Sequence, residues 1–76
     1  MSEVIEELAR RLVDDPAAVR VERIDDADGL LLRLHVAPDD VGKVIGRQGR
    51  IVRALRIVAR ATAGGGGRRV QLEIAD

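Results

Sequence analysis

The spacing of hydrophobic residues changes along the chain, and in its first half it predicts a helix followed by two strands. Residues 3–13 carry apolar side chains at helical spacing, and Pro16 ends this helix because the residue before a proline avoids the α region. Residues 19–24 and 30–36 alternate as strands. The turn between them is so short that the two strands must form an antiparallel hairpin.

The second half of the chain has the spacing of two helices and a strand. Pro38 starts a short helix that runs to about Ile45, and residues 49–62 form a longer one. Residues 64–67 are four glycines, expected to be a flexible link, and residues 69–74 alternate as a last strand. The order is α-β-β-α-α-β, and the last two strands should be parallel because helices connect them. We therefore expect an α+β domain in which three helices cover one face of a three-stranded mixed sheet.

The helix expected at 49–62 has an apolar face that can pack in the core and an opposite face that is rich in arginine. Its apolar face carries Ile51, Leu55, Val58 and Thr62. The opposite side carries four arginines, here called the arginine ridge: Arg50, Arg53, Arg56 and Arg60. The last three fit a solvated surface, an RNA track or a subunit contact, and Ile57 on the same side hints at an interface.

Length and composition narrow the class of protein. Seventy-six residues make one small domain. Since there is no Cys, Phe, Tyr or Trp, aliphatic side chains must form the core, and neither a disulfide nor a zinc–cysteine cluster is available. The acidic, amphipathic start is unlike a signal peptide, and no apolar run approaches the roughly 18 residues of a membrane span. We therefore expect a cytoplasmic protein that does not enter membranes.

The net charge of zero conceals a segregation of charges along the chain. Residues 1–40 hold eleven acidic and five basic side chains, a net charge of −6, whereas residues 41–76 hold two acidic and eight basic ones, a net charge of +6. Between Val41 and Arg69 there is no acidic residue. This asymmetry favours a surface that meets a polyanion, although an unevenly charged solvated surface gives the same composition.

The most informative segment is Gly46-Arg47-Gln48-Gly49, a G-x-x-G turn between the two helices of the second half. Gly46 should end the first helix at positive φ, and Gly49 should open the second. Two positions without side chains let a phosphodiester approach the backbone, whose exposed amides and helix N-terminus favour an anion. A tight turn that needs glycine for geometry alone is the alternative, but its apolar flanks and nearby cations favour a phosphate-binding turn.

The segment from Gly42 to Arg50 resembles the signature of the KH domain, whose G-x-x-G loop clamps the backbone of about four nucleotides. The expected element order is that of the type II, bacterial form of this domain. Residues 12–16 and 19–21 extend the resemblance over almost the whole chain to the KhpA family of stand-alone bacterial KH proteins. Two features depart from the family, namely the bulky residues 51–52 after the loop and the four-glycine link.

This resemblance implies a single KH domain over residues 1–76 that binds single-stranded RNA without catalysis, cofactor, metal or small-molecule substrate. It implies an RNA chaperone or post-transcriptional regulator linked to cell elongation and division, acting as a homodimer or with a larger KhpB-like partner. Leu34 or Val36 should lie near the far wall of the RNA groove. The residues expected to contact RNA are Lys43, Ile45, Gly46, Arg47, Gln48, Gly49, Arg50, Val52 and Arg53.

Other classes of protein remain open from the residues alone. Two helices joined by a glycine turn also fit a helix-turn-helix DNA-binding protein, although its second helix would need polar side chains in its first turns to read bases. A KH fold could also serve protein interaction without RNA. An enzyme is disfavoured because no nucleophile and base are paired.

Three groups of polar residues fit structural roles better than chemical ones. His35 is the only histidine, and we expect it at a solvated strand position rather than against a base. Asp39 and Asp40 fit a helix N-terminus. The three aspartates at 25–28 have the wrong spacing for a calcium-binding EF-hand and fit a hairpin turn.

Overall fold

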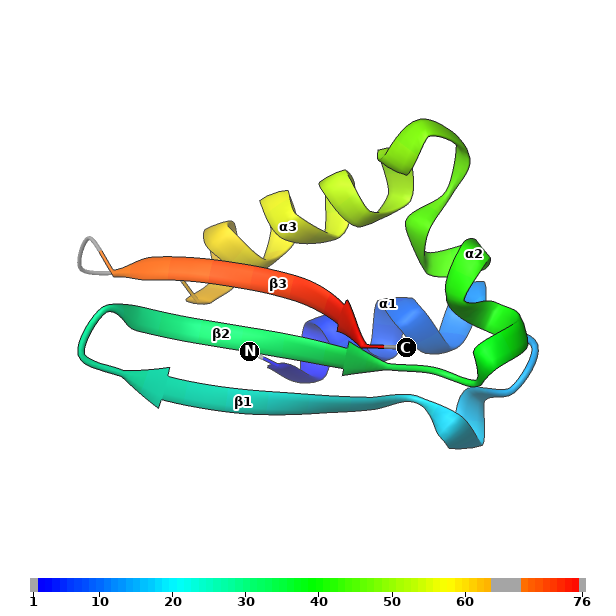
Figure 1. Ribbon diagram of the computed structural model, residues 1–76, viewed down its shortest axis with the longest axis horizontal. Coiled ribbons are helices and arrows are strands. Elements are labelled where there is room, and N and C mark those ends of the chain that lie inside the picture. The colour runs from blue at the N-terminus through cyan, green and yellow to red at the C-terminus, as the bar shows by residue number, and fades with distance from the viewer. Residues whose placement is uncertain (1, 64–67, 76) are drawn as a thin grey trace.

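The computed structural model describes residues 2–63 and 68–75, and the expected order α-β-β-α-α-β is confirmed (Figure 1). The helices and strands are α1 Ser2–Leu12, β1 Arg20–Asp26, β2 Gly29–His35, α2 Val41–Ile45, α3 Arg50–Ala63 and β3 Arg69–Ala75. Short 3-10 turns lie at Pro16–Ala18, Pro38–Asp40 and Arg47–Gly49. The four-glycine link expected at 64–67 lies outside the described residues.

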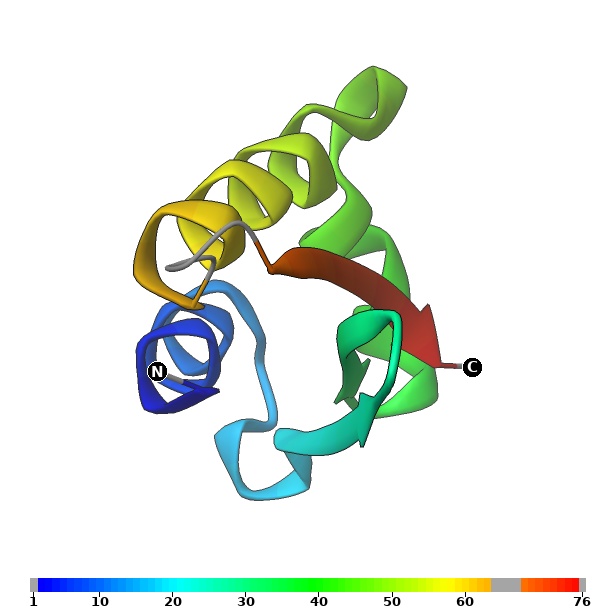
Figure 2. The same ribbon diagram turned by 90° about the vertical axis from the view of Figure 1, so that its left-hand side faces the viewer.

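The three strands form one mixed sheet with β2 at its centre. β1 pairs with β2 in the antiparallel sense and β3 pairs with it in the parallel sense, as predicted. α1 and α3 lie on one side of this sheet (Figure 2), and α2 lies at the end where β2 and β3 finish (Figure 1). The junction between α2 and α3 is therefore held at one end of the helical layer.

The core is aliphatic and is built around β2. Every second residue of this strand points toward the helices and is a buried leucine: Leu30, Leu32 and Leu34. The residues between them face outward and are half-buried: Leu31, Arg33 and His35. This division is the one that the alternation predicts. On the outward face, Arg33 pairs with Glu22 of β1 and with Glu73 of β3, so one guanidinium joins all three strands.

α3 packs on the sheet through a stripe that differs from the predicted one at its end. Its buried and half-buried apolar residues are Ile51, Val52, Leu55, Val58 and Ala59. Thr62 was expected on the same face but is exposed, and its hydroxyl donates to the Val58 carbonyl at 2.9 Å. The difference arises because the last turn of the helix lies beyond the buried stripe, where a hydroxyl finds its acceptor within its own helix.

Asp40 is the one buried charged side chain in the described chain, with 2% of its surface exposed. The sequence predicted a helix N-terminus for it, but its side chain makes no capping hydrogen bond to α2. Its carboxylate instead accepts the amides of Asp14 and Asp15 at 3.3 and 3.1 Å and lies 3.3 Å from the Lys43 ammonium. Asp40 therefore fastens the start of α2 to the segment that follows α1.

The pKa of Asp40 follows from these contacts. Burial by itself would raise the pKa, but the amides of Asp14 and Asp15, together with Lys43, outweigh it and hold the pKa below the ordinary value of 3.8. Since the folded state has the lower pKa, Asp40 stabilises the fold above about pH 3.8. This contribution is lost as the pH falls through the folded-state pKa.

Replacing Asp40 by Asn should destabilise the domain at neutral pH and cost much less in acid. The side-chain amide of the new Asn would place its own N–H donors near the backbone amides of Asp14 and Asp15, which are donors as well. We therefore expect the thermal midpoint to fall by roughly 5–10 °C at neutral pH. The difference from the wild type should narrow as the pH falls below 3.8, which thermal melts followed by circular dichroism would measure. A difference independent of pH would contradict a role for the carboxylate charge.

Candidate nucleic-acid interface

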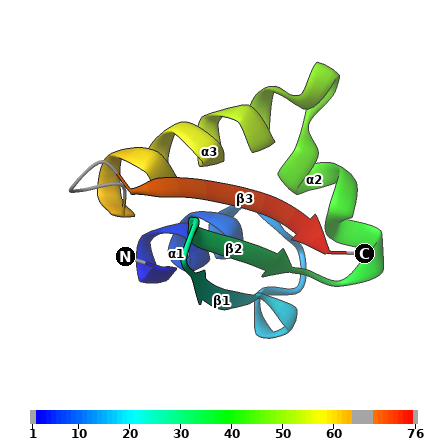
Figure 3. The same ribbon diagram turned by 60° about the vertical axis from the view of Figure 1, so that its left-hand side comes forward.

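The G-x-x-G turn projects from the end of the domain where α2 and α3 meet (Figure 3). The Gly46 amide donates to the Gly42 carbonyl at 2.9 Å, and Gly46 then ends α2 with a φ of 76°. Gln48 and Gly49 also have positive φ, 58° and 72°. Three of the four residues of the turn therefore lie in the region that favours glycine, and the positive φ predicted for Gly46 is confirmed.

Gly46 is needed for space as well as for conformation. A Cβ atom on it would lie 2.3 Å from Cγ1 of Ile51, the bulky residue after the loop. Ile51 packs against the core, so it has little room to move away. At Gly49 a Cβ atom would meet only Val52, at 3.8 Å, and this side of the turn is open to a ligand. The bulk of Ile51 and the bare α-carbon of Gly46 thus fit each other.

The backbone of the turn keeps two amides for a ligand. Gly49 donates to the Gly46 carbonyl at 3.1 Å, and Arg50 donates to the Arg47 carbonyl. Within the part of the chain that the structure describes, none of the hydrogen bonds uses the amide of Arg47 or Gln48. α3 begins directly after the turn, so the positive end of its dipole lies beside these two groups. This arrangement can bind a phosphate oxygen.

The predicted contact residues around the turn differ in exposure. Arg47, Arg50 and Arg53 are exposed, and no carboxylate among residues 2–63 and 68–75 pairs with them. Ile45 is 37% exposed and offers apolar surface next to the turn. Val52 is only 7% exposed, so it supports the turn from below and offers little surface to a base.

Lys43 and Leu34 both make contacts within the domain. The Lys43 ammonium lies 3.1 Å from Asp14 and 3.3 Å from Asp40, and its hydrogen bonds to these carboxylates raise its pKa above the ordinary 10.5. Its charge is thus engaged in holding α2 to the end of α1. Of the two residues expected near the far wall of the RNA groove, Leu34 is completely buried, whereas Val36 is half-buried against the same core and keeps some surface to offer there.

A groove lies between α3 and the edge strand β3, farther along α3 than the turn. The residues that line it are Leu31, Arg56, Arg60, Gln71, Leu72 and Glu73. Arg56 crosses this groove, because its Nε donates to the Leu72 carbonyl at 3.2 Å. An adjoining hollow toward the start of β3 is lined by Arg60, Arg68, Arg69, Val70 and Gln71. Part of the arginine ridge therefore forms one side of the groove, and β3 forms the other.

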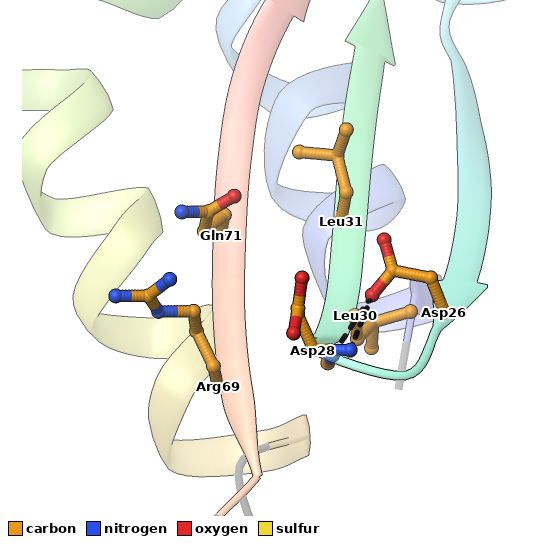
Figure 4. Close-up of a pocket in the computed structure, with 7 residues that line it drawn as sticks. Asp26, Asp28, Leu30, Leu31, Arg69 and Gln71 are labelled. Carbon is orange, nitrogen blue, oxygen red and sulfur yellow. Dashed lines mark hydrogen bonds between the residues drawn. The ribbon is translucent and has the colours of Figure 1, made fainter.

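Figure 4 shows the end of this surface at the β1–β2 hairpin, where Arg69 and Gln71 extend from β3 on the side of α3. Across from them, the Asp26 carboxylate accepts the amides of Asp28 and Gly29 at 2.8 and 3.0 Å, which confirms the predicted hairpin turn. Sequence reasoning missed the groove. The alternation marks Arg69 and Gln71 as exposed, but it does not say that β3 is the edge strand beside α3.

His35 lies on the outward face of the sheet, with Nε2 3.1 Å from Oε1 of Glu22. This hydrogen bond lowers the pKa of Glu22. His35 is half-buried, so it is a strand residue with a partner inside the sheet. Residues 2–63 and 68–75 hold no group of three His, Asp or Glu side chains placed to bind a metal ion. Across the same residues, every helix is too short or too polar to span a membrane.

The order of elements, the mixed sheet and the projecting G-x-x-G turn define a type II KH domain. The family model described as "KhpA/KhpB, KH domain" matches residues 2–74. The chain belongs to this family, which is one of binding proteins rather than enzymes.

Curated relatives match the chain over nearly its whole length. The "RNA-binding protein KhpA" of Halalkalibacterium halodurans is 50% identical over 76 residues, which cover 100% of both chains. The proteins of the same name from Clostridium acetobutylicum and Mycobacterium tuberculosis are each 45% identical over 74 residues. These cover 97% of this chain and 99% and 89% of theirs. No solved structure gives a significant match.

Replacing Gly46 by Ala should destabilise the domain by about 2–4 kcal/mol, since it adds a side chain at positive φ and presses it against Ile51. Gly42→Ala is the matched control, because Gly42 is helical and an added Cβ would meet nothing within 4 Å. This control should stabilise the domain by about 0.5–1 kcal/mol. Urea unfolding measures both, and equal stabilities would contradict the packing of the turn.

Proposed function

We propose that this chain binds single-stranded RNA through its G-x-x-G turn. The observation that carries the proposal is the projecting turn, where the Arg47 and Gln48 amides are left for a ligand beside the start of α3. A phosphate held there would lie near the Arg47 and Arg50 guanidinium groups. Relatives that are 45–50% identical over almost their whole length are named RNA-binding proteins, which supports the same function here.

The bases of a bound strand would meet aliphatic and hydrogen-bonding surface. Ile45 is exposed next to the turn, and the groove between α3 and β3 continues beyond it. Because the chain has no aromatic residue, base stacking on a ring, worth about 1–3 kcal/mol per base, is unavailable. Affinity for one short site should be modest, and two domains held together would raise it through effective concentration.

The geometry favours a single strand over duplex DNA. A helix-turn-helix protein inserts its second helix into the major groove. Here Arg56 and Arg60 of the arginine ridge lie beside β3, and Arg56 is held at the Leu72 carbonyl, so the sheet obstructs such an insertion. A domain kept only for protein interaction would not need the open space at Gly49 or the unpaired arginines around the turn.

In the cell, the proposed role is that of a cytoplasmic RNA chaperone or post-transcriptional regulator linked to cell elongation and division. It would act with a larger KhpB-like partner that also contains a KH domain. Support for this comes from the resemblance of the chain to the KhpA family and from the family model, whose description names KhpA and KhpB together.

The surface between α1 and α3 would hold a second copy of the chain. Apolar side chains line a groove there, and its residues are Leu8, Arg11, Leu12, Ile51, Ala54, Leu55 and Val58. Ile57, on the arginine side of α3, is also 59% exposed. Exposed apolar surface of this kind is typical of a site covered in an assembly. Self-association would place two G-x-x-G turns in one particle and provide the effective concentration that a single site lacks.

Replacing both Arg47 and Gln48 by Asp should abolish most RNA binding, because two negative charges would stand where the phosphate is held. Aspartate tolerates positive φ better than most residues, so the turn should keep its shape. Fluorescence anisotropy with a labelled single-stranded RNA should show tighter binding than with duplex DNA. If about four phosphates are engaged, log K should fall with log[salt] at a slope near −3.

Arg20→Asp serves as a charge control and should reduce RNA binding much less, since β1 is the edge strand on the opposite side of the sheet from β3, beside which α3 lies. If the double variant at Arg47 and Gln48 binds RNA as tightly as the wild type, the turn is not part of the RNA interface. Preference for duplex DNA would favour the helix-turn-helix alternative.

Replacing Ile57 by Lys should weaken self-association without unfolding the domain, because this side chain is already largely exposed. Sedimentation velocity over a range of protein concentrations would measure the monomer–dimer equilibrium of both proteins. A wild-type chain that stays monomeric at every concentration would contradict the homodimer, and an unchanged equilibrium in the variant would move the interface away from Ile57.

A further inference from the structure

β1 is an edge strand of the mixed sheet, and one of its long sides has no neighbouring strand. β2 pairs with the other side, and in the described part of the chain no further strand runs along the free one (Figure 1). The helices lie on one face of the sheet and leave this edge open (Figure 2). The free side of β1 can therefore pair with a strand from another molecule.

The register of the hairpin shows which backbone groups of β1 point to the free side. Only two residues separate Asp26 from its partner Gly29, so these two form a hydrogen-bonded pair, and such pairs alternate along the strand. Val21, Arg23 and Asp25 therefore direct their N–H and C=O groups away from β2. Among the described residues, no backbone hydrogen bond outside the sheet uses these groups. They are available to a strand that adds to the edge.

The side chains along this edge carry charges of both signs. Arg23 and Asp25 are both exposed, and Nε of Arg23 lies 3.1 Å from Oδ2 of Asp25. Charged side chains on an edge discourage pairing with an arbitrary strand but allow a strand whose charges are complementary. A second copy of β1 in the antiparallel sense is such a strand, because it presents the same charges in reverse order.

Symmetry and charge together select one register for two copies of β1. In a continuous antiparallel sheet the two-fold axis passes through one residue of the strand, which then faces its own copy. An axis at any of the charged residues would place two like charges opposite each other. An axis at Val21 would set the end of the second strand against the turn at Pro16–Ala18, which is not extended. An axis at Ile24 places Arg23 of each copy opposite Asp25 of the other.

One contact in this register is between like charges. Glu22 would lie opposite Asp26 of the second copy, on the outward face of the sheet. Each of these carboxylates already has partners in its own sheet. Oε1 of Glu22 lies 3.1 Å from Nε2 of His35, and Asp26 accepts the amides of Asp28 and Gly29. Their mutual repulsion is therefore weaker than that of two free carboxylates.

We propose that β1 is a self-association edge, along which two copies of this chain join their sheets into one continuous sheet with Ile24 on the two-fold axis. Two isoleucines would meet at the axis, and two pairs of unlike charges, Arg23 with Asp25, would flank them. A contact of one strand pair is smaller than the interface of most stable dimers, so the association should be weak. The proposal depends neither on RNA binding at the turn nor on the surface between α1 and α3.

The test introduces one thiol into the full chain, which has no cysteine of its own. Ile24→Cys would bring two thiols together across the axis, where the Cα atoms are about 4.5 Å apart and a disulfide can form. Leu31→Cys is the matched control, because Leu31 is the β2 partner of Ile24 and is also half-buried, but lies one strand inside the edge. Under mild oxidation, Ile24→Cys should form disulfide-linked dimers at least about 10-fold faster, as measured by non-reducing electrophoresis.

A charge reversal tests the register in the Ile24→Cys protein. Arg23→Asp should slow the cross-linking at least about fivefold, because both flanking pairs then hold like charges. Adding Asp25→Arg restores unlike pairs and should recover the rate, and thermal melts should show that all variants are folded. Equal rates for the two cysteine positions would overturn the inference, as would a double charge variant that stays slow. Faster cross-linking through Leu31→Cys would indicate contact between sheet faces and would equally overturn it.

Discussion

At Gly46 the chain reverses between two helices in a space that a single methyl group would fill, because the side chain of Ile51 packs against its α-carbon. Ile51 also packs against the core, so the shape of the turn is tied to the packing of the whole domain. Gln48, which has a side chain at a φ of 58°, is held in a conformation that costs a free residue on the order of 1 kcal/mol. A turn fixed in this way needs little further ordering when it meets a ligand.

The segregation of charge in the sequence becomes a division of roles in the fold. Acidic residues of the first half are largely engaged within the protein. Asp40 holds α2 to the segment after α1, and Asp14 pairs with Lys43 there. The cations that remain unpaired in the described chain include Arg47 and Arg50 at the turn. Positive potential is therefore concentrated where the backbone also offers donors, although the net charge of the chain is zero.

The spacing of hydrophobic residues predicts the features that depend only on residues close together in the sequence. The element order, the hairpin and the inward leucines of β2 follow from spacing alone, and the positive φ of Gly46 follows from its place at a helix end. What the sequence could not give depends on contacts between distant segments. From the sequence, Asp40 is expected to begin a helix, but its hydrogen-bond partners are the amides of Asp14 and Asp15, 26 and 25 positions away. Arg56 reads as part of a solvated ridge until β3 is known to be the edge strand beside it.

Leu34 and Val36 show the same limit. Alternation puts both on one face of β2, but only the fold shows that Leu34 is completely buried and that Val36, beyond the end of the strand, is half-buried. Lys43 lies near the turn in sequence, yet its side chain pairs with the carboxylates of Asp14, which follows α1, and Asp40, which directly precedes α2. The sequence pattern thus predicts the position of the turn. The groove between α3 and β3 can be recognised only from the three-dimensional arrangement of these two elements.

The aliphatic core and the exposed ion pairs have a practical consequence. Pairs such as Arg11–Glu7 lie at the surface, where each contributes about 0–1 kcal/mol and is weakened by dissolved ions. The fold should therefore tolerate high ionic strength, while attachment to a polyanion should not. A concentrated salt wash would strip carried-over nucleic acid from the intact domain, and dialysis would restore its capacity to bind without any refolding step.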